Sequence, residues 1–339
     1  MLEDAREVSF PSETDSNNPV FWQVFRGANQ LSVITSAPAP LLSVGPTLQS
    51  LAVVGPAAFS NLVDGGRWIE AVLPDGAGRL YGYYHYEPSW ICADGTKTAP
   101  QIGAARSTDG GRTWKDLGIV LAAPPGNPNC RTPNKYFAGG VGDFSVVLDE
   151  SKLDVYFLFT SYGPDTAHQG VSVARMLWAR RDSPAGHVAV WSDGVWRHPE
   201  PTDEGGWEYP TPSPIFRVRG SWHSTRRMVD AFWGPSVHWN TFLKRYVMLL
   251  NRTKELEWGQ EGVYLSSTAT LDDPASWSMP QKLVHGGRWY AQVIGLEPGS
   301  GTDRLAGERA RFFMGRTSNH EIRFLDQSAA GTGTPSTTR

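Results

Sequence analysis

The stretch DGGRWIEAV occupies residues 64–72, and a closely similar stretch, HGGRWYAQV, recurs at residues 285–293. In each copy a Gly-Gly turn and an Arg-Trp pair lead into a short run of the kind that forms a β-strand. Two near-copies far apart in one chain indicate an internal repeat. An internal repeat decides the architecture, because each copy is one structural unit.

Working outward, each copy begins a unit of three or four predicted strands joined by tight turns. Similar units begin at NPVFWQVF (18–25), GDFSVVL (142–148) and GPSVHWNTF (234–242), which makes five. Five antiparallel units of this size predict an all-β fold, a five-bladed β-propeller with four-stranded blades. A pair of β-sandwiches is the alternative, but the similar openings of the units favour a single ring.

The fifth unit lacks a fourth strand, and the N-terminal stretch REVSF (6–10) can supply it. Pairing the two ends of the chain closes the ring and removes an exposed sheet edge. We therefore expect one propeller domain over residues 1–327 and a flexible C-terminal tail over 328–339.

Composition agrees with this fold and excludes some classes of partner. The chain of 339 residues has 14 Trp, 36 Gly and 25 Pro, which suits short strands and many turns, and 3.6-residue periodicity is nearly absent. The net charge of -3, without a basic tract, argues against a nucleic-acid partner. No apolar run approaches the ~20 residues of a membrane helix. The start resembles no signal peptide, so we expect a cytoplasmic protein, or a secreted or periplasmic one whose signal was removed.

The chain has two cysteines, Cys92 and Cys130, without the spacing of a zinc site. Two readings stay open, a pair of free thiols and a disulfide that joins two loops. The disulfide would imply an oxidising compartment.

The stretch RSTDGGRTW (106–114) predicts a turn between the third and fourth strands of the second unit. LDDPASW (271–277) has the same place in the fourth unit. Asp side chains bond nearby backbone N–H groups and Gly adopts positive φ, while the Trp packs on the turn. We interpret these stretches as structural.

Candidate chemistry follows from position in the ring. The beginnings of the inner strands share one face with the loops that join strands two and three, so side chains there converge. Asp15, Glu70 and Asp143 lie at such beginnings in three units, and Glu261 lies in such a loop. Burying an ionised carboxylate is costly, so this arrangement needs a functional reason. Paired carboxylates of different pKa are the machinery of glycoside hydrolysis.

Other polar and aromatic side chains fall at the same positions, and aromatic rings offer flat surfaces for sugars. Structural roles stay open as well, with Asp15 as a turn residue, Glu70 as a partner of Arg67 or Arg288, and His238 as a core histidine. The residues predicted to bind substrate are Trp68, His85, Asp230, Trp233, His238, Arg288, Trp289 and Tyr290.

With these residues the chain resembles the five-bladed propeller glycoside hydrolases, families 43 and 62 and the related fructan-cleaving families 32 and 68. The turn at 106–114 resembles the Asp-box of sialidases, which lies on the outer, non-catalytic end of a blade. The resemblance implies an acid that opens blade 1, matched by Asp15, and a second on blade 3, matched by Asp143. It also implies a Glu proton donor on blade 4, where this chain has Trp233.

The sequence therefore predicts a glycosidase acting on an oligo- or polysaccharide. Asp15 would activate water or attack, Asp143 would tune pKa and orient the sugar, and Glu70 or Glu261 would protonate the leaving oxygen, with Asp230 a further candidate donor. We predict no cofactor and no catalytic metal, and leave a structural Ca²⁺ near the axis open. The alternatives are a non-catalytic carbohydrate-binding propeller, a sialidase-like enzyme, and a lyase or phosphorylase.

Overall fold

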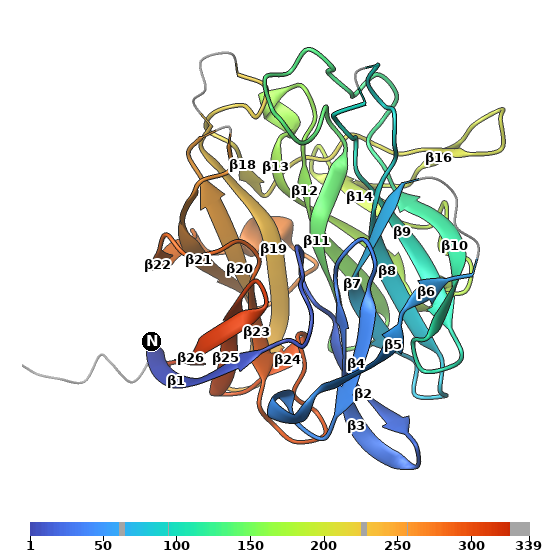
Figure 1. The fold of residues 1–339 in the computed structure, drawn as a ribbon. Helices are drawn as coiled ribbons and strands as arrows, with labels where there is room; N and C mark the ends of the chain where they lie inside the picture. Colours follow the sequence, from blue (N-terminus) through green and yellow to red (C-terminus); the bar gives the residue numbers. More distant parts are fainter. Residues whose placement is uncertain (61–64, 94, 225–228, 256, 326–339) are drawn as a thin grey trace, which may run out of the picture.

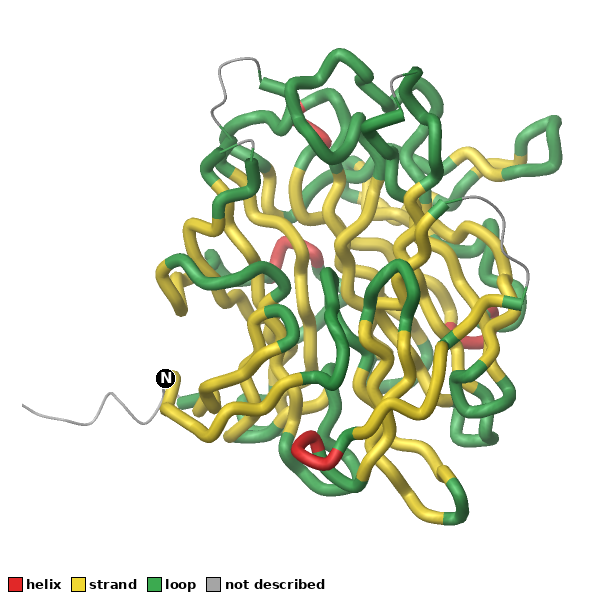
Figure 2. The backbone as a smooth tube through the Cα atoms, viewed as in Figure 1, coloured by secondary structure: helices red, strands yellow, loops and turns green. Residues whose placement is uncertain are grey.

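The fold is a five-bladed β-propeller (Figure 1). The computed structural model describes residues 1–60, 65–93, 95–224, 229–255 and 257–325, and the predicted tail at 328–339 lies outside them. Across these ranges the regular structure is strand and short 3₁₀ turn without an α-helix, so no described helix could span a bilayer (Figure 2). The 3₁₀ turns are η1 (Leu48–Ser50), η2 (Thr166–His168), η3 (Trp178–Arg180) and η4 (Pro274–Ser276).

Blades 1 and 2 follow the predicted order, each strand pairing with the next along the chain. Blade 1 contains β2 (Val20–Phe25), β3 (Ala28–Thr35), β4 (Leu41–Gly45) and β5 (Ala52–Pro56). Blade 2 contains β7 (Gly66–Pro74), β8 (Leu80–Glu87), β9 (Gln101–Ser107) and β10 (Thr113–Leu121), with β6 (Ala58–Phe59) at its outer edge.

Blades 3 and 4 each carry an addition to the repeat. Blade 3 contains β11 (Val141–Leu148), β12 (Asp154–Ser161), β13 (Gly170–Leu177), β14 (Ala189–Ser192) and β15 (Val195–Arg197), with β18 (Phe216–Arg217) against β13. A hairpin of β16 (Glu200–Pro201) and β17 (Trp207–Glu208) projects from this side of the molecule (Figure 1). Blade 4 contains β19 (Ala231–Asn240), β20 (Arg245–Thr253), β21 (Gln260–Thr268) and β22 (Gln281–His285), with β24 (Leu305–Ala306) parallel to β19.

The N-terminal strand completes blade 5, as the sequence predicts. This blade contains β23 (Ala291–Gly295), β25 (Arg309–Met314), β26 (Thr317–Arg323) and β1 (Leu2–Ser9). Strand β1 pairs with β26 from Leu2 opposite Ile322 to Ser9 opposite Thr317. Just beyond it Phe10 stacks on Phe313, with ring centroids 4.5 Å apart. The ring is closed by contact between the two ends of the chain.

The hydrophobic core lies between neighbouring blades. Strand β12 shows why, because its residues from Val155 to Ser161 are buried on both faces of the sheet. Between blades 2 and 3, Tyr83 meets Phe157 edge to face at a centroid distance of 5.0 Å. Strand β12 pairs with the inner strand β11, so close packing around β12 also holds β11 and the side chains at its start in place.

The turn at 106–114 lies between β9 and β10, where the sequence places it. Asp109 Oδ1 accepts the backbone N–H groups of Arg112 at 3.1 Å and Thr113 at 3.0 Å. The fully buried Trp114 donates its indole N–H to the Gly111 carbonyl at 3.0 Å. These bonds within the chain hold the turn together, in agreement with a structural role.

Candidate active site

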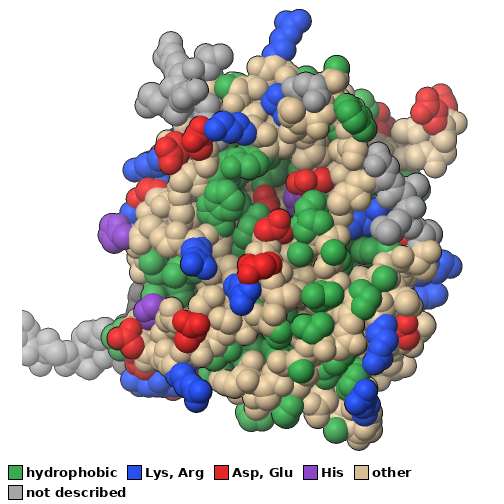
Figure 3. All heavy atoms as spheres, viewed as in Figure 1, with side chains coloured by type: hydrophobic (Ala, Val, Ile, Leu, Met, Phe, Trp, Pro, Cys, Tyr) green, Lys and Arg blue, Asp and Glu red, His purple; other side chains and the backbone are tan. Residues whose placement is uncertain are grey.

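One end of the ring axis holds a cavity of about 260 Å³, and all five blades contribute to its lining. In Figure 3 a hollow in the upper part of the molecule shows acidic and histidine atoms framed by hydrophobic ones. The lining residues are Asp15, Ser16, Trp68, Glu70, His85, Glu87, Pro100, Tyr136, Phe137, Asp143, Tyr162, Trp233, Trp258, Trp289 and Tyr290.

Local breaks in strand pairing aim the functional side chains at this cavity. The pairing of β7 with β8 shifts register around Glu70, and that of β11 with β12 shifts around Asp143. The pairing of β19 with β20 shifts just after Trp233. A bulge turns a side chain out of the regular alternation, so three inner strands present a residue to the axis in the same way.

A chain of ionisable groups crosses the blade 2 side of the cavity. His85 Nδ1 lies 3.4 Å from Glu70 Oε1, and its Nε2 lies 3.3 Å from Glu87 Oε1. Glu70 Oε2 also accepts the backbone N–H of Phe144 at 2.9 Å. Glu70 is only 2% exposed, whereas the Glu87 side chain is 39% exposed. The imidazole therefore connects a buried acid with one near solvent.

Asp143 is held from both sides. Tyr162 donates its hydroxyl hydrogen bond to Oδ2, and Tyr290 donates to Oδ1 at 3.2 Å. Asp143 has a φ of +41°, and its backbone nitrogen lies 3.2 Å from His85 Nδ1. The glycine before it is required, because a Cβ on Gly142 would lie 2.5 Å from His85 Cε1. The carboxylate thus has a fixed orientation beside the imidazole.

Asp15 approaches from blade 1 and is the exposed acid at the mouth of the cavity. Its backbone N–H donates to the Ser36 carbonyl at 3.0 Å, and its side chain is hydrogen-bonded to Trp68. Although the residue as a whole is exposed, loss of hydration at its carboxyl group raises the pKa of Asp15. The negative charges of Glu87 and Asp143 raise this pKa further, whereas the hydrogen bond with Trp68 opposes the shift.

Burial and neighbouring charges shift the pKa values of the acids and the histidine in the cavity. Burial raises the pKa of Glu70 to about 7, although the hydrogen bond to His85 opposes this. Burial also raises the pKa of Asp143. Burial alone would lower the pKa of His85, but its bonds to Glu70 and Glu87 raise it well above 6.5. Near neutral pH the Glu70 carboxyl group can therefore hold a proton, and His85 is the basic side chain that lies among the acids of the lining.

Aromatic rings form the opposite wall. Trp233 lies edge to face against Trp258 at 4.7 Å and against Trp289 at 5.8 Å. Trp289 donates its indole N–H to the Trp258 carbonyl at 2.7 Å. Trp258 also stacks on Trp222, with centroids 4.1 Å apart. These contacts hold the rings together, and aromatic and acidic side chains line one small space. This combination is suited to a ring with both hydroxyl groups and apolar faces.

The structure brings eight of the twelve predicted site residues to this cavity and leaves four outside it. Glu261 is paired with Lys282 and Tyr264 on blade 4, and this pairing lowers its pKa against the effect of burial. Asp230 forms a two-bonded ion pair with Arg252, at 2.9 and 3.0 Å. Both carboxylates have cationic partners away from the lining, which the sequence alone could not reveal.

The other two are His238 and Arg288. His238 is 1% exposed and lies beside Phe324, 5.6 Å between ring centroids. Burial without a charged partner lowers the pKa of His238 to about 3, so it is a neutral core histidine, the structural alternative considered from the sequence. Arg288 is exposed and does not line the cavity.

Four lining aromatics were not predicted as site residues. Tyr162 directly follows β12, and Trp258 lies between β20 and β21, so both belong to the loops that join strands two and three. The positional rule that indicated His85 would have found them. Tyr136 and Phe137 come from the connection between β10 and β11, for which the sequence offers no rule.

The Glu70, His85 and Asp143 side chains each place one ligand-type atom within 4.8 Å of the other two. A cation would need these atoms free. Both oxygens of Asp143 accept tyrosine hydroxyls, and both nitrogens of His85 face carboxylates. Tyrosine hydroxyls hold Asp143, whereas Glu70 Oε1 and His85 Nε2 have no hydrogen-bond partner among the described residues, and we assign the group no metal step. The Ca²⁺ considered from the sequence stays a prediction.

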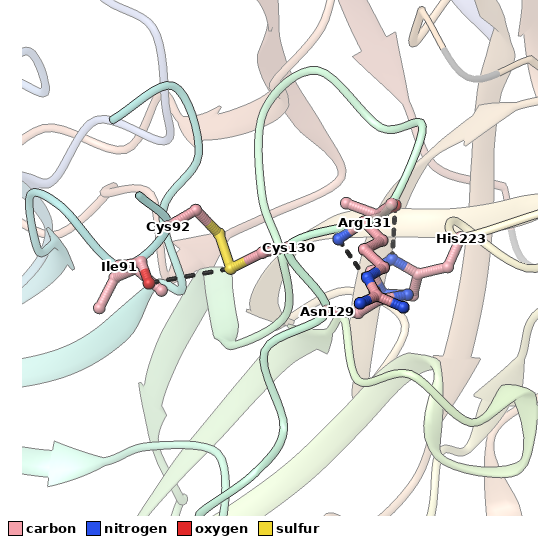
Figure 4. Close-up of a disulfide and its surroundings, with 7 residues drawn as sticks. Ile91, Cys92, Asn129, Cys130, Arg131 and His223 are labelled. Atoms are coloured by element: carbon pink, nitrogen blue, oxygen red, sulfur yellow. Dashed lines mark hydrogen bonds between the residues drawn. A yellow bond between two sulfur atoms is a disulfide. The ribbon is translucent and has the colours of Figure 1, made fainter. Parts of the chain in front are cut away.

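A disulfide joins two loops beside the cavity. Cys92, in the connection from β8 to β9, is bonded to Cys130, in the connection from β10 to β11 (Figure 4). The structure thus decides between the two readings of the cysteines. The second of these connections also carries Tyr136 and Phe137, which line the cavity.

Fold and site together define a class, five-bladed propellers with an acidic and aromatic cavity on the axis. Among solved structures, an exo-β-1,3-galactanase from Phanerochaete chrysosporium is similar with a TM-score of 0.52 and 12% identity, over 96% of this chain and 66% of that one. An exo-1,5-α-L-arabinanase from a bovine ruminal metagenomic library is similar with a TM-score of 0.51 and 10% identity, over 93% of this chain and 97% of that one. An endo-arabinase from Bacteroides thetaiotaomicron is similar with a TM-score of 0.50 and 11% identity, over 94% of this chain and 98% of that one.

These similarities show the fold, and they confirm the architectural resemblance predicted from the sequence. This chain spans just under two thirds of the galactanase chain. No family model matches the sequence, and no curated protein sequence matches it significantly.

Proposed function

We propose that this protein is a glycosidase that cleaves an oligo- or polysaccharide in the axial cavity. The observation that carries the proposal is the convergence of acids from blades 1, 2 and 3 with an aromatic wall from blades 3, 4 and 5. The similarity in fold to a galactanase and to arabinanases supports the same class of chemistry.

In this proposal the three acids have different tasks. Asp15, at the mouth, acts as the base for water or as the nucleophile. Glu70, with its pKa raised to about 7, holds the proton that passes to the leaving oxygen. Asp143, clamped by Tyr162 and Tyr290, positions the sugar and keeps the pKa of Glu70 high by its negative charge. An acid and a carboxylate of separated pKa values are what glycosidic cleavage requires.

The charge of the cavity favours a neutral sugar. The lining contains four carboxyl groups and no lysine or arginine. An anionic sugar would meet like charges in a partly dry site, where repulsion is strong. This argues against the sialidase alternative, whose substrate carboxylate needs arginines.

The test is product analysis on neutral oligosaccharides. β-1,3-Galacto- and α-1,5-arabino-oligosaccharides are incubated with the wild type and with Asp15→Asn, Glu70→Gln and Asp143→Asn. We expect each variant to lose at least about a hundredfold in kcat/KM, while its melting temperature stays close to that of the wild type. Glu261→Gln, which changes an acid outside the cavity, is the matched control and should retain activity. Equal turnover by the wild type and all three variants would refute the assignment.

One observation favours a second function, carbohydrate binding without turnover. Trp233 occupies the position on β19 where the resembled families carry their acid, and Glu70 is almost completely buried. A cavity with this composition can bind a sugar without protonating it. Calorimetric titration that shows affinity for an oligosaccharide, together with no products after long incubation, would favour this alternative.

A further inference from the structure

A second hollow of about 370 Å³ lies beside the axial cavity, under the loop that follows β8. We propose that it binds a further sugar unit of an oligosaccharide whose neighbouring unit occupies the axial cavity, so that the protein prefers longer ligands. This inference rests on the proposed function and extends it from the cavity to the loop. The lining residues are Gly66, Glu87, Pro88, Ser89, Trp90, Gly95, Thr96, Lys97, Thr98 and Tyr136.

The two spaces adjoin, because Glu87 and Tyr136 line both of them. In the proposal a linear ligand passes from one space to the other along these two side chains. Glu87 is also the solvent-side partner of His85. A ligand that fills both spaces would therefore touch the ionisable chain at its outer end.

The lining suits a sugar. The lining includes the hydroxyl groups of Ser89, Thr96 and Thr98 and the aromatic rings of Trp90 and Tyr136. The Thr98 hydroxyl donates to the Pro88 carbonyl at 3.2 Å, which leaves its oxygen as an acceptor. Hydroxyl side chains match sugar hydroxyls as donors and acceptors, and an aromatic face covers the apolar face of a pyranose or furanose.

Trp90 is held in an unusual exposed position. Its side chain is 75% exposed, and its backbone has a φ of +60°. The ring packs closely over Gly95, where an added Cβ would lie 2.7 Å from the ring. The indole lies beside the hydroxyl groups of the hollow, where it is available to cover the apolar face of a sugar ring.

The site is built in advance of binding. The backbone N–H of Thr98 donates to the Tyr136 carbonyl at 3.3 Å, and that of Ala138 donates to the Thr98 carbonyl at 2.7 Å. The Cys92–Cys130 disulfide joins the same two connections (Figure 4). These bonds tie the loop that carries Trp90 to the loop that carries Tyr136, so a ligand would lose less affinity to the ordering of loops.

The experiment is calorimetric titration of the full chain carrying Asp15→Asn, which prevents consumption of the ligand. The probes are β-1,3-galacto- and α-1,5-arabino-oligosaccharides of two to six units. Trp90→Ala is introduced into this background, with Trp90→Phe as the conservative variant. Trp207→Ala is the matched control, because Trp207 is 40% exposed on the projecting hairpin and lines neither space.

We expect affinity to rise with ligand length, and Trp90→Ala to weaken the binding of the longer ligands about tenfold. Disaccharide affinity should change less than twofold, Trp90→Phe should restore most of the loss, and Trp207→Ala should behave as the background does. If the longer ligands bind equally well with and without Trp90, the subsite is refuted while the proposed function stands. If the wild type and the Asp15→Asn background bind no probe, both are overturned.

Discussion

At the scale of single residues, the account depends on how one histidine is shared among acids. His85 contacts Glu70 on one side and Glu87 on the other, and Asp143 lies beside the same ring. One histidine side chain cannot neutralise all of these acidic groups, and Asp15 adds another to the same lining. A proton retained on Glu70 near neutral pH relieves the excess of charge, and it is also the proton that the proposed reaction needs.

The pH dependence of catalysis follows from these pKa values. Glu70 must be protonated to donate, and it loses its proton as the pH rises through about 7. Asp15 must be ionised, and its pKa is raised above 3.8. We therefore expect a bell-shaped profile of kcat/KM, with an alkaline fall near pH 7 and an acid fall at a higher pH than an ordinary Asp would give. Initial rates from pH 3 to 10 check this, and a profile flat through pH 7 would remove Glu70 from the role of donor.

The tyrosine clamp gives a second prediction at this scale. Tyr162→Phe removes the hydroxyl that bonds Asp143 Oδ2. We expect kcat to fall about tenfold or more, because Asp143 is no longer held in position. The alkaline fall of the pH–rate profile should also move, because the charge of Asp143 acts on the pKa of Glu70. Tyr209→Phe, a buried tyrosine bonded to the Ile119 carbonyl, is the control. A loss of stability with an unchanged pH profile would mean that the clamp is only structural.

At the scale of elements, the inner strands are positioned by their breaks in pairing. Strands β7, β11 and β19 each shift register near the cavity, next to Glu70, Asp143 and Trp233. Regular alternation alone would place these side chains on one face or the other of a blade. The bulges turn them toward the axis, and packing between blades keeps the bulges in place.

Gly142→Ala tests this positioning. The new Cβ would lie 2.5 Å from His85 Cε1 and 3.0 Å from Pro100 Cβ, so the imidazole must move away from β11. We expect activity to fall by about tenfold or more while the protein still folds. Gly206→Ala is the control, since its nearest neighbour would be Thr202 Oγ1 at 3.4 Å on a distant hairpin. Unchanged kinetics in Gly142→Ala would show that the exact place of His85 is unimportant.

The disulfide also belongs to this scale. It closes a loop with a sequence separation of 38 residues, for which the loss of unfolded-state entropy predicts about 4 kcal/mol of stabilisation. The double variant Cys92→Ser/Cys130→Ser should therefore unfold at a lower urea concentration than the wild type. Because the bond ties down the proposed subsite, the variant should also lose affinity for long oligosaccharides first. A stability equal to that of the oxidised wild type would contradict this estimate.

The sequence predicts which strands carry the site residues, but it does not predict which side chains meet in the folded protein. Strand order and inner-strand starts are readable from local patterns, which is why Asp15, Glu70 and Asp143 were predicted together. Partners in space are not readable. Glu261 and Asp230 were predicted for the site because the sequence does not show that Lys282 and Arg252 pair with them. Tyr136 reaches the cavity through a long connection whose path depends on tertiary contacts.

At the scale of the whole molecule, the site exists because all five blades of the ring contribute residues to one cavity. Residues as distant in sequence as Asp15 and Tyr290 line one cavity only because five blades share an axis. The fold could be predicted because a repeat is visible in the sequence, and so could the closure by the N-terminal strand. The cavity's depth and charge depend on how the blades pack, which no local pattern records.

Closure can be tested by deleting residues 1–9. The deletion removes β1, exposes the edge of β26 and uncovers the apolar contacts of the buried Val8. We expect a fall in melting temperature of more than about 5 °C and a tendency to associate through the free edge. Glu7→Gln, which keeps the strand and changes an exposed side chain, is the control. A truncated chain as stable and monomeric as the control would show that closure contributes nothing.

The most direct test of the central claim is a crystal structure of the Asp15→Asn variant with a neutral oligosaccharide. The account predicts a sugar unit in the axial cavity, with an apolar face against the wall of Trp233 and Trp289. Its glycosidic oxygen should lie within hydrogen-bonding reach of the acids of blades 1 and 2. An oligosaccharide bound elsewhere on the ring, with the cavity holding only solvent, would contradict the account.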